Sequence, residues 1–230
     1  DPLSNPVIAE TLDVEARAWV DATLADLTLR ELIGQVIIEW IPGGYVTATS
    51  TEFEPLRAWV EDDQIGGVSP SIGTPHAYVS KLNELQNRAG VPVSMGSDAC
   101  RAALKAYGNV RRIAVLTPYM PIGDKQVIKF FRDCGFEVVK LIGLQCKSPQ
   151  KIAHVSERCL KDNIIMLNGP DVDAIVQVGT NLAFARVAAI AEFWLEKPVV
   201  AINTATYWWA LRQAGINDKI FGLGRIFEEH

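Results

Sequence analysis

The segment DAIVQVGTNLAFARV, residues 173–187, combines features that could form a binding site for an anion. Its apolar first part predicts a buried strand, the turn Gly179-Thr180-Asn181 ends that strand, and a helix follows at once. This order directs several backbone N–H groups and a helix N-terminus at one point, which suits a carboxylate or a phosphate. The turn offers a glycine, a hydroxyl and an amide, so we predict anion binding there without a strong nucleophile or base.

A second group of polar residues follows the next predicted strand, PVVAIN. Asn203 ends that strand, and Thr204 and Thr206 stand at the start of the helix after it. Because the carboxyl ends of parallel strands meet at one edge of a sheet, these side chains can face the same cleft as the turn after residue 178. Thr204 or Thr206 could instead cap that helix, as Thr180 and Asn181 could cap the helix after the turn.

Apolar runs and segments with helical spacing alternate along the chain, which predicts an α/β fold. The predicted strands are residues 35–40, 65–71, 91–96, 111–119, 136–144, 173–179 and 198–203. Strands separated by helices pair in parallel through right-handed crossovers, and we predict a doubly wound three-layer sandwich. Closure into a (βα)-barrel is the alternative, because seven strands are close to the eight that a barrel needs.

The helices carry clear terminal signals. Thr28 and Glu31 have the spacing of a capping box, and Gly90 ends the helix predicted before it. One helix is predicted over residues 148–162, begun by Ser148 with a proline behind it.

Composition excludes several classes of protein. The chain has 230 residues with 22 Lys and Arg against 27 Asp and Glu, a net charge of −5, and no basic patch, which argues against a nucleic-acid partner. Its apolar runs are too short to cross a bilayer, so we expect no membrane partner. The cysteines lack the spacing of a zinc site, so we predict no metal and no cofactor. Scattered thiols favour a reducing compartment, and we expect the cytoplasm. These cysteines are Cys100, Cys134, Cys146 and Cys159.

Residues 15–98 resemble the beginning of the family 3 glycoside hydrolase barrel. The resemblance rests on LADLTLRELIGQ and on QIGGVSPSIGTPHAYVSKLNELQNRAGVPVSMGSD. It implies that Asp98 corresponds to an aspartate that binds sugar hydroxyls at the end of a strand. Both catalytic carboxylates of that family lie beyond the matching segment, so we do not expect glycosidase activity. Asp98 could equally cap the helix that follows it.

Residues 101–230 resemble the C-terminal half of the aspartate/glutamate racemase superfamily, which includes maleate isomerase, arylmalonate decarboxylase and ectoine-utilisation proteins. The resemblance rests on ALKAYGNVRRIAVLTPYM, GFEVVKLIGL, VDAIVQVGTNLAFARVAAIAEFWLEKPVVAINTATYW and LRQAGINDKIFGLGRIFEE. It implies that Tyr119 contacts a substrate carboxylate, and that Gly179 and Thr180 occupy the turn where these enzymes carry their second cysteine. Thr180 would then replace that cysteine, and its hydroxyl has too high a pKa for acid–base work at neutral pH without help.

Two ancestries in one chain lead to an interpretation as a chimera. It would have barrel-derived units over residues 1–98 and racemase-like units over 99–230, with a natural fusion as the alternative origin. Because the first half of the racemase fold would be missing, we expect an inactive scaffold that keeps a carboxylate-binding turn. The alternative is a working isomerase or lyase on a small dicarboxylate, using Tyr119 and Thr180 as catalytic residues. The expected ligand is a small carboxylate, and a face left uncovered by the missing half could drive homodimerisation.

Overall fold

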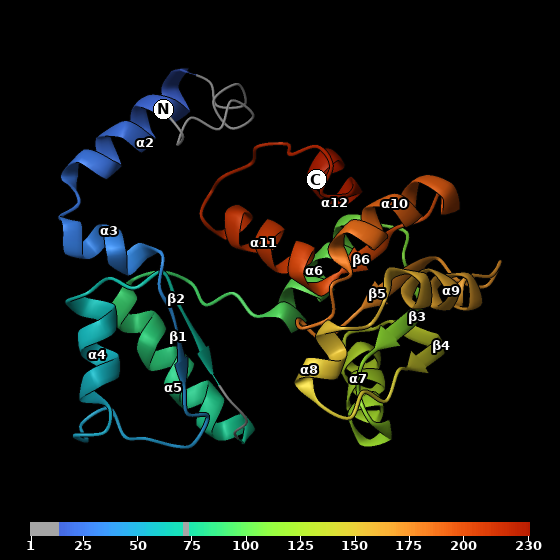
Figure 1. Ribbon diagram of the computed structural model, residues 1–230, viewed down its shortest axis with the longest axis horizontal. Helices are drawn as coiled ribbons and strands as arrows, with labels where there is room; N and C mark the ends of the chain where they lie inside the picture. Colours follow the sequence, from blue (N-terminus) through green and yellow to red (C-terminus); the bar gives the residue numbers. More distant parts are fainter. Residues whose placement is uncertain (1–13, 71–73) are drawn as a thin grey trace. The chain divides into compact units, whose positions relative to one another are not determined.

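The computed structural model describes residues 14–70 and 74–230, and the chain divides into two compact units (Figure 1). The first unit runs from Asp1 to Val93 and the second from Ser94 to His230. Each unit is described by itself. In the described ranges, no helix is long and apolar enough to cross a membrane.

The first unit holds a two-stranded parallel sheet and four helices in its described residues. Strand β1 (Ile38–Ile41) pairs with β2 (Gly67–Pro70). Side chains of the sheet and its helices form a small core of Ile41, Phe53, Leu56 and Leu85. The capping box predicted at Thr28 is confirmed at the start of α3. The helices are α2 (Val14–Asp26), α3 (Leu29–Gln35), α4 (Glu54–Glu61) and α5 (Pro75–Ala89).

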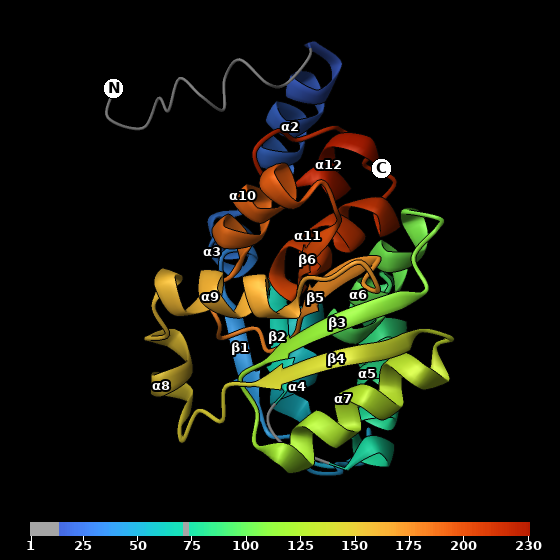
Figure 2. The same cartoon turned by 90° about the vertical axis from the view of Figure 1, so that its right-hand side faces the viewer.

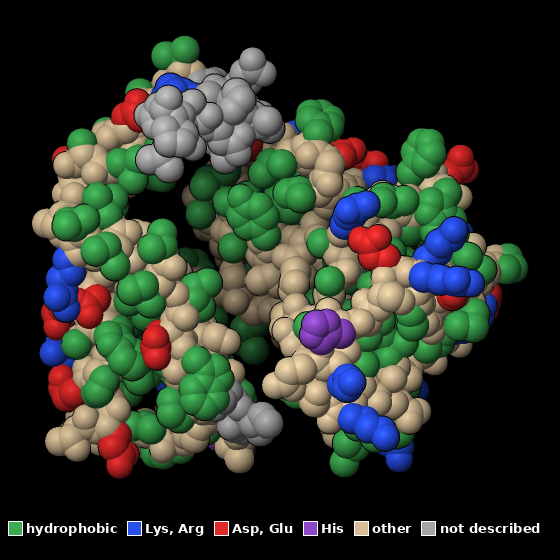
Figure 3. Space-filling model, viewed as in Figure 1, with side chains coloured by type: hydrophobic (Ala, Val, Ile, Leu, Met, Phe, Trp, Pro, Cys, Tyr) green, Lys and Arg blue, Asp and Glu red, His purple; other side chains and the backbone are tan. Residues whose placement is uncertain are grey.

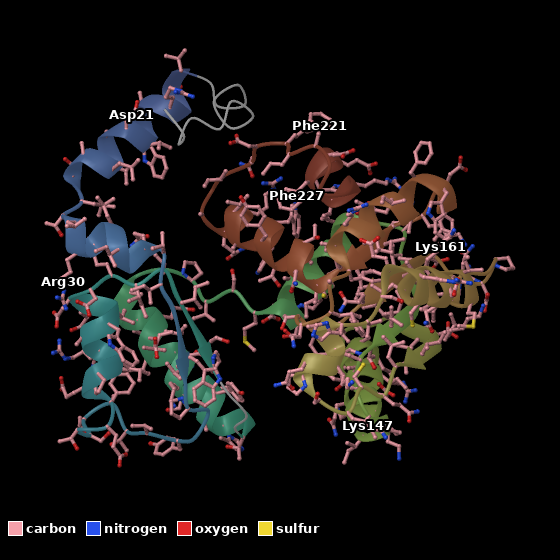
Figure 4. All side chains as sticks on the ribbon, viewed as in Figure 1. Asp21, Arg30, Lys147, Lys161, Phe221 and Phe227 are labelled. Atoms are coloured by element: carbon pink, nitrogen blue, oxygen red, sulfur yellow. The ribbon has the colours of Figure 1, made fainter. Side chains whose placement is uncertain are left out.

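Much of the apolar surface of the first unit stays exposed. Ile38 and Trp40 of β1 are 70% and 64% exposed, whereas Ile41 is fully buried. Hydrophobic side chains also appear on the visible face of this unit (Figure 3). Arg30 of α3, labelled in Figure 4, pairs with Asp63 over 2.5 Å. A core this small stabilises the unit far less than a sheet with two covered faces would.

The second unit is built on four parallel strands in the order β4-β3-β5-β6, which lie side by side in Figure 2. The strands are β3 (Arg112–Thr117), β4 (Glu137–Gly143), β5 (Ala174–Gln177) and β6 (Val199–Ala201). The sheet is open, with β4 and β6 as its outer strands. The predicted doubly wound arrangement is therefore confirmed, and the barrel alternative is wrong. The helices are α6 (Gly96–Ala106), α7 (Pro121–Asp133), α8 (Pro149–Ala153), α9 (Glu157–Leu167), α10 (Ala185–Leu195), α11 (Ile202–Gln213) and α12 (Arg225–Glu229).

Helices cover both faces of this sheet. Ile113 and Val115 of β3 belong to a core cluster with side chains from α6, α7, α11 and α12. Ala114 and Leu116, which point the other way, pack with α9 and α10. Phe227 of α12, labelled in Figure 4, is fully buried and joins the first cluster. The apolar character of both strand faces follows from this double cover.

Two predicted elements differ from the structure. No strand forms over residues 91–96: Pro92 has no N–H for a ladder, and the N–H of Val93 donates to Oε1 of Gln86 over 3.0 Å. The predicted helix over 148–162 is divided, because Ser156 has an extended backbone and its hydroxyl accepts from the N–H of Cys159, starting α9 anew. The described residues therefore contain six strands, one fewer than predicted.

Candidate functional site

The candidate site lies at the carboxyl-terminal edge of the four-stranded sheet. Tyr119 follows β3 by two residues, the turn 179–181 follows β5, and Asn203 lies in the first turn of α11 directly after β6. Because these three strands are parallel neighbours, their ends bring the three segments together. All of this belongs to the second unit.

The turn after β5 has a backbone that favours glycine. Gly179 has φ of +96°, and a Cβ built on it would stand 2.5 Å from Cγ of Pro118 and 3.6 Å from the hydroxyl oxygen of Tyr119. The Tyr119 hydroxyl therefore lies beside the turn. The backbone N–H groups of Gly179, Thr180 and Asn181 have no acceptor among the residues that the structure describes. Successive backbone N–H groups without an internal acceptor are donors that an anion can pair.

Tyr119 is fixed by a buried polar pair beneath it. Its backbone N–H donates to Oγ1 of Thr117 over 3.1 Å, and the Thr117 hydroxyl donates in turn to the carboxylate of Asp124. The side chain of Tyr119 lies against Gly123: a Cβ built on Gly123 would stand 2.8 Å from Cβ of Tyr119. Burial, and to a lesser extent the neighbouring Cys100, raises the pKa of the Tyr119 phenol. The phenol is therefore protonated at neutral pH and can donate a hydrogen bond.

Two amide side chains brace the turn. Asn203 donates from Nδ2 to the carbonyl of Thr180 over 2.9 Å, and Asn181 donates to the carbonyl of Pro149 over 2.7 Å. The Thr180 side chain itself is exposed. Neither Thr180 nor Asn181 caps α10, whose N-cap is Phe184 without a side-chain hydrogen bond. The structure thus brings the turn, Tyr119 and Asn203 together.

The remaining predicted site residues are engaged elsewhere. Thr206 donates to the carbonyl of Ile202 over 2.7 Å, inside its own helix. Thr204 lines a small cavity with Glu192 on the α10 side of the sheet. Asp98 lies in the first turn of α6 and pairs with Arg101 over 2.8 Å, while the N-cap of that helix is Met95. The structure therefore shows no contact of these three with the turn.

Cys100 lies next to the site but is not reactive. Its side chain is fully buried in α6, and burial raises its pKa to about 12. A thiol that is buried and protonated does not act as a nucleophile at neutral pH. In the described ranges, no group of three or more His, Cys, Asp or Glu side chains is placed to hold a metal ion.

The sequence reasoning missed three buried polar residues at this edge, namely Thr117, Asp124 and Gln177. All three are at most 9% exposed. Thr117 and Gln177 are the last residues of β3 and β5. A polar residue at the end of an otherwise apolar strand is the signal that could have identified both, because a buried polar group needs a hydrogen-bond partner nearby.

Comparison with known proteins identifies the family of this chain. The model of the arylmalonate decarboxylase family matches residues 65–227. The maleate isomerase of Alcaligenes faecalis is 24% identical over 143 residues, which cover 61% of this chain and 56% of that protein. The chain therefore spans little more than half the length of this curated relative.

Solved structures of the same kind share the fold. A maleate isomerase variant from Pseudomonas putida with maleate has a TM-score of 0.67 at 22% identity, over 77% of this chain and 75% of that one. An arylmalonate decarboxylase variant in a sulfate-associated form has a TM-score of 0.62 at 21% identity, over 84% and 99%. A maleate cis-trans isomerase of Nocardia farcinica bound to TRIS has a TM-score of 0.57 at 18% identity, over 95% and 82%.

These matches correct the functional interpretation. An inactive chimeric scaffold is wrong, because the matching family model and the relatives are those of enzymes. The matched range 65–227 includes residues on both sides of the predicted junction at 98–99, and the comparisons give the glycoside hydrolase resemblance no support. The assignment of residues 1–98 and 99–230 to different ancestries stays a prediction. The resemblance to the racemase superfamily is confirmed, and the chain belongs to the arylmalonate decarboxylase family.

Proposed function

We propose that the chain is an isomerase or a lyase that acts on a small dicarboxylate, and that it binds one carboxylate at the turn 179–181. The observation that carries the proposal is the set of three backbone N–H groups without an acceptor among the described residues, with the Tyr119 hydroxyl beside them. Donors fixed in this way bind a carboxylate without having to reorganise.

The chemistry of both reaction types needs such donors. In decarboxylation of a malonate, one carboxylate leaves as CO2, the electron pair of the broken bond spreads onto the remaining carboxylate as an enediolate, and the carbon then takes a proton from water. In cis-trans isomerisation, a nucleophile such as water adds to one alkene carbon, and the electron pair of the double bond moves onto a carboxylate as an enediolate. The resulting single bond rotates, and expulsion of the same nucleophile restores the double bond in the trans form. Both enediolates carry more charge on oxygen than the substrate does, so N–H donors at that point lower the barrier.

The residues take distinct roles in this proposal. Tyr119 donates from its protonated hydroxyl to the carboxylate, because its raised pKa keeps the proton on the phenol. Thr180 contributes its backbone N–H, while Asn203 holds the carbonyl of Thr180 and so fixes the turn. Gly179 lets Pro118 pack against the turn, since any side chain there would collide with Pro118.

The comparisons support the class of substrate. The curated relative is named a maleate isomerase, and the Pseudomonas putida structure holds maleate. Maleate and arylmalonates are both small dicarboxylates. A site that offers several N–H donors and one phenol at a single point suits one of their two carboxylates.

The test is turnover of maleate and of phenylmalonate by the purified full chain, followed by NMR. We expect turnover of one of the two. Tyr119→Phe should lower kcat/KM about a hundredfold, the usual effect of losing one donor to a developing oxyanion. Tyr207→Phe is the matched control, because this tyrosine of α11 is 51% exposed and packs against Phe227 of α12. No turnover of either substrate, or equal rates for the two variants, would contradict the proposal.

A further inference from the structure

Gln177 is a buried amide whose hydrogen bonds all go to the turn beside it. It is the last residue of β5 and only 1% exposed. Its Nε2 donates to the carbonyl of Val178 over 2.8 Å and to the carbonyl of Gly179 over 2.9 Å. Two successive carbonyl groups therefore converge on one side-chain nitrogen.

This convergence, together with the N–H of Leu182 that also donates to the Gly179 carbonyl over 3.1 Å, orients the N–H groups of the turn. In a planar trans peptide the C=O and N–H bonds point in opposite directions. The Val178 carbonyl shares its peptide plane with the N–H of Gly179, and the Gly179 carbonyl shares its plane with the N–H of Thr180. Because Gln177 draws both carbonyls toward the interior, both N–H groups point away from it. These are two of the three donors that lack an acceptor among the described residues.

The turn needs such a restraint because it contains a glycine. Gly179 must lack a Cβ, both for its φ of +96° and for its closeness to Pro118. Glycine, however, populates many backbone conformations with similar ease, so the peptide planes on either side of it can rotate. A rotated plane would turn its carbonyl toward the substrate, and a carbonyl repels a carboxylate.

We propose that Gln177 is a positioning residue of the site, which locks the two peptide planes so that the N–H groups of Gly179 and Thr180 face the substrate carboxylate. The inference rests on the proposed function in that the ligand is a carboxylate. Gln177 touches no substrate atom and acts through the backbone of the turn. Substitution of Gln177 should weaken carboxylate binding more than the accompanying loss of folding stability explains.

The principal test compares Gln177→Met with a matched buried amide, Asn163→Leu. Methionine has the length of glutamine but no donor. Asn163 is 8% exposed and donates to the carbonyl of Cys159 within α9, so its loss also removes a hydrogen bond made by a buried amide. Calorimetric titration of the full-length variants with maleate and with phenylmalonate measures Kd. We expect Kd of the bound dicarboxylate to rise about tenfold or more in Gln177→Met and to change less than about twofold in Asn163→Leu, at similar losses of Tm.

A second variant keeps the inference testable if Gln177→Met does not fold. Gln177→Glu has the same shape, and its carboxyl group donates one hydrogen bond only while it is protonated. Dicarboxylate affinity relative to wild type should therefore recover as pH falls through the pKa of the introduced carboxyl group. An effect on stability alone would change Tm with pH but not the affinity of the folded variant relative to wild type. Ionic strength separates repulsion by the introduced charge, which salt screens, from the loss of the hydrogen bond.

The outcomes separate the inference from the proposed function. If wild type binds neither dicarboxylate, the proposed function is wrong and the inference fails with it. If wild type binds one and Gln177→Met binds it equally well, the proposed function stands and the inference is overturned. Weakened binding in Gln177→Met with unchanged binding in Asn163→Leu supports the inference. Equal weakening in both variants, or a flat pH profile of Gln177→Glu relative to wild type, contradicts it.

Discussion

The amino-terminal and carboxyl-terminal edges of the four-stranded sheet differ in whether their backbone N–H groups have an acceptor. At the amino-terminal edge, the Asp173 carboxylate accepts from the N–H groups of Arg111 and Arg112 over 3.1 and 2.7 Å. It also accepts from the Arg112 guanidinium over 2.8 Å. At the carboxyl-terminal edge, the N–H groups of residues 179–181 have no acceptor among the described residues. The first edge supplies its own carboxylate, and the second leaves that place to a ligand.

Glu192 repeats the pattern of the amino-terminal edge at β6. Its carboxylate accepts from the N–H of Val199 over 2.9 Å, from the N–H of Arg225 over 2.7 Å and from the Tyr107 hydroxyl over 3.3 Å. A backbone donor left unpaired in a buried place costs free energy. Internal carboxylates therefore stabilise the fold at one edge, and the absence of such carboxylates at the other edge makes binding possible.

The largest expected effect is that of Gly179→Ala, which disrupts the carboxyl-terminal edge. The methyl group would meet both an unfavourable φ and Cγ of Pro118 at 2.5 Å. We expect a loss of about 2–4 kcal/mol in the free energy of unfolding, from backbone strain plus overpacking. Turnover should fall as well, because the turn has to move to avoid the collision with Pro118. Urea denaturation and steady-state kinetics measure the two losses.

Gly135→Ala is the control for that variant. Gly135 has a similar φ of +90°, but a Cβ there would have no neighbour within 4 Å. We expect a loss of about 1–2 kcal/mol from strain alone, with turnover unchanged. Equal stability losses in the two variants would show that Pro118 does not crowd the turn.

Glu192→Ala should disrupt the amino-terminal edge almost as severely. Removal of the carboxylate leaves two backbone N–H groups and the Tyr107 hydroxyl without their partner, at a position only 5% exposed. We expect a loss of about 2–3 kcal/mol by chemical denaturation, with dicarboxylate affinity retained. Glu157→Ala on α9 is the control and should change stability little. The Glu157 side chain is 63% exposed, and its ion pair with Arg186 is long, at 3.9 Å.

The effect of Asp173→Asn should be smaller and should depend on pH. Hydrogen bonds from Arg112, first from its side chain and then from its backbone, lower the pKa of Asp173 to about 2 from an ordinary 3.8. A lowered pKa stabilises the fold above the unfolded value of 3.8, and this contribution is lost as pH falls through about 2. Because the side chain is 24% exposed, solvent screening leaves about 1 kcal/mol at neutral pH.

Denaturation curves of wild type and Asp173→Asn between pH 7 and pH 2 test this. The difference in the free energy of unfolding should be constant above about pH 5 and should fall to a small fraction of that value by about pH 2. Asp133→Asn is the control, because its carboxylate is 59% exposed and pairs only with Lys129 in the described structure. A difference that persists at the lowest pH would contradict the role assigned to the Asp173 carboxylate.

The sequence predicted the architecture of the second unit because its strands are bounded by strong signals. In the run RIAVLT, residues 113–116 are apolar and buried, and glycine follows the helix before the next strand. The same reasoning failed at residues 91–96, where an apolar run contains Pro92 and has no partner strand in the structure. Apolar composition does not distinguish a strand from a segment whose N–H groups are bound by a side chain such as Gln86.

The candidate site could be predicted only in part. The turn 179–181 was identified because a glycine and small polar residues between a strand and a helix form a recognisable pattern. Gln177 and Asp124 were missed because their importance depends on which carbonyl or hydroxyl lies within reach, and this is decided by tertiary contacts. Thr204 was predicted from its closeness in sequence to Asn203, but a helix turns successive side chains to different sides, and Thr204 lines the cavity beside Glu192.

Thr180→Ala should have the smallest effect, and it distinguishes the backbone of the turn from its side chains. Thr180 was predicted to be a catalytic residue, but its side chain is exposed, and only its backbone takes part in the contacts that the structure gives it. Alanine keeps the N–H and the carbonyl that Asn203 holds, so kcat/KM should change less than about threefold, as for a substitution that removes no donor to the oxyanion. A loss close to that of Tyr119→Phe would instead assign the hydroxyl a direct role in the reaction. Alanine leaves the three N–H groups of the turn in place, so a near-neutral result would assign carboxylate binding to these backbone N–H groups. Backbone N–H groups likewise bind the carboxylates of Asp173 and Glu192 at the opposite edge.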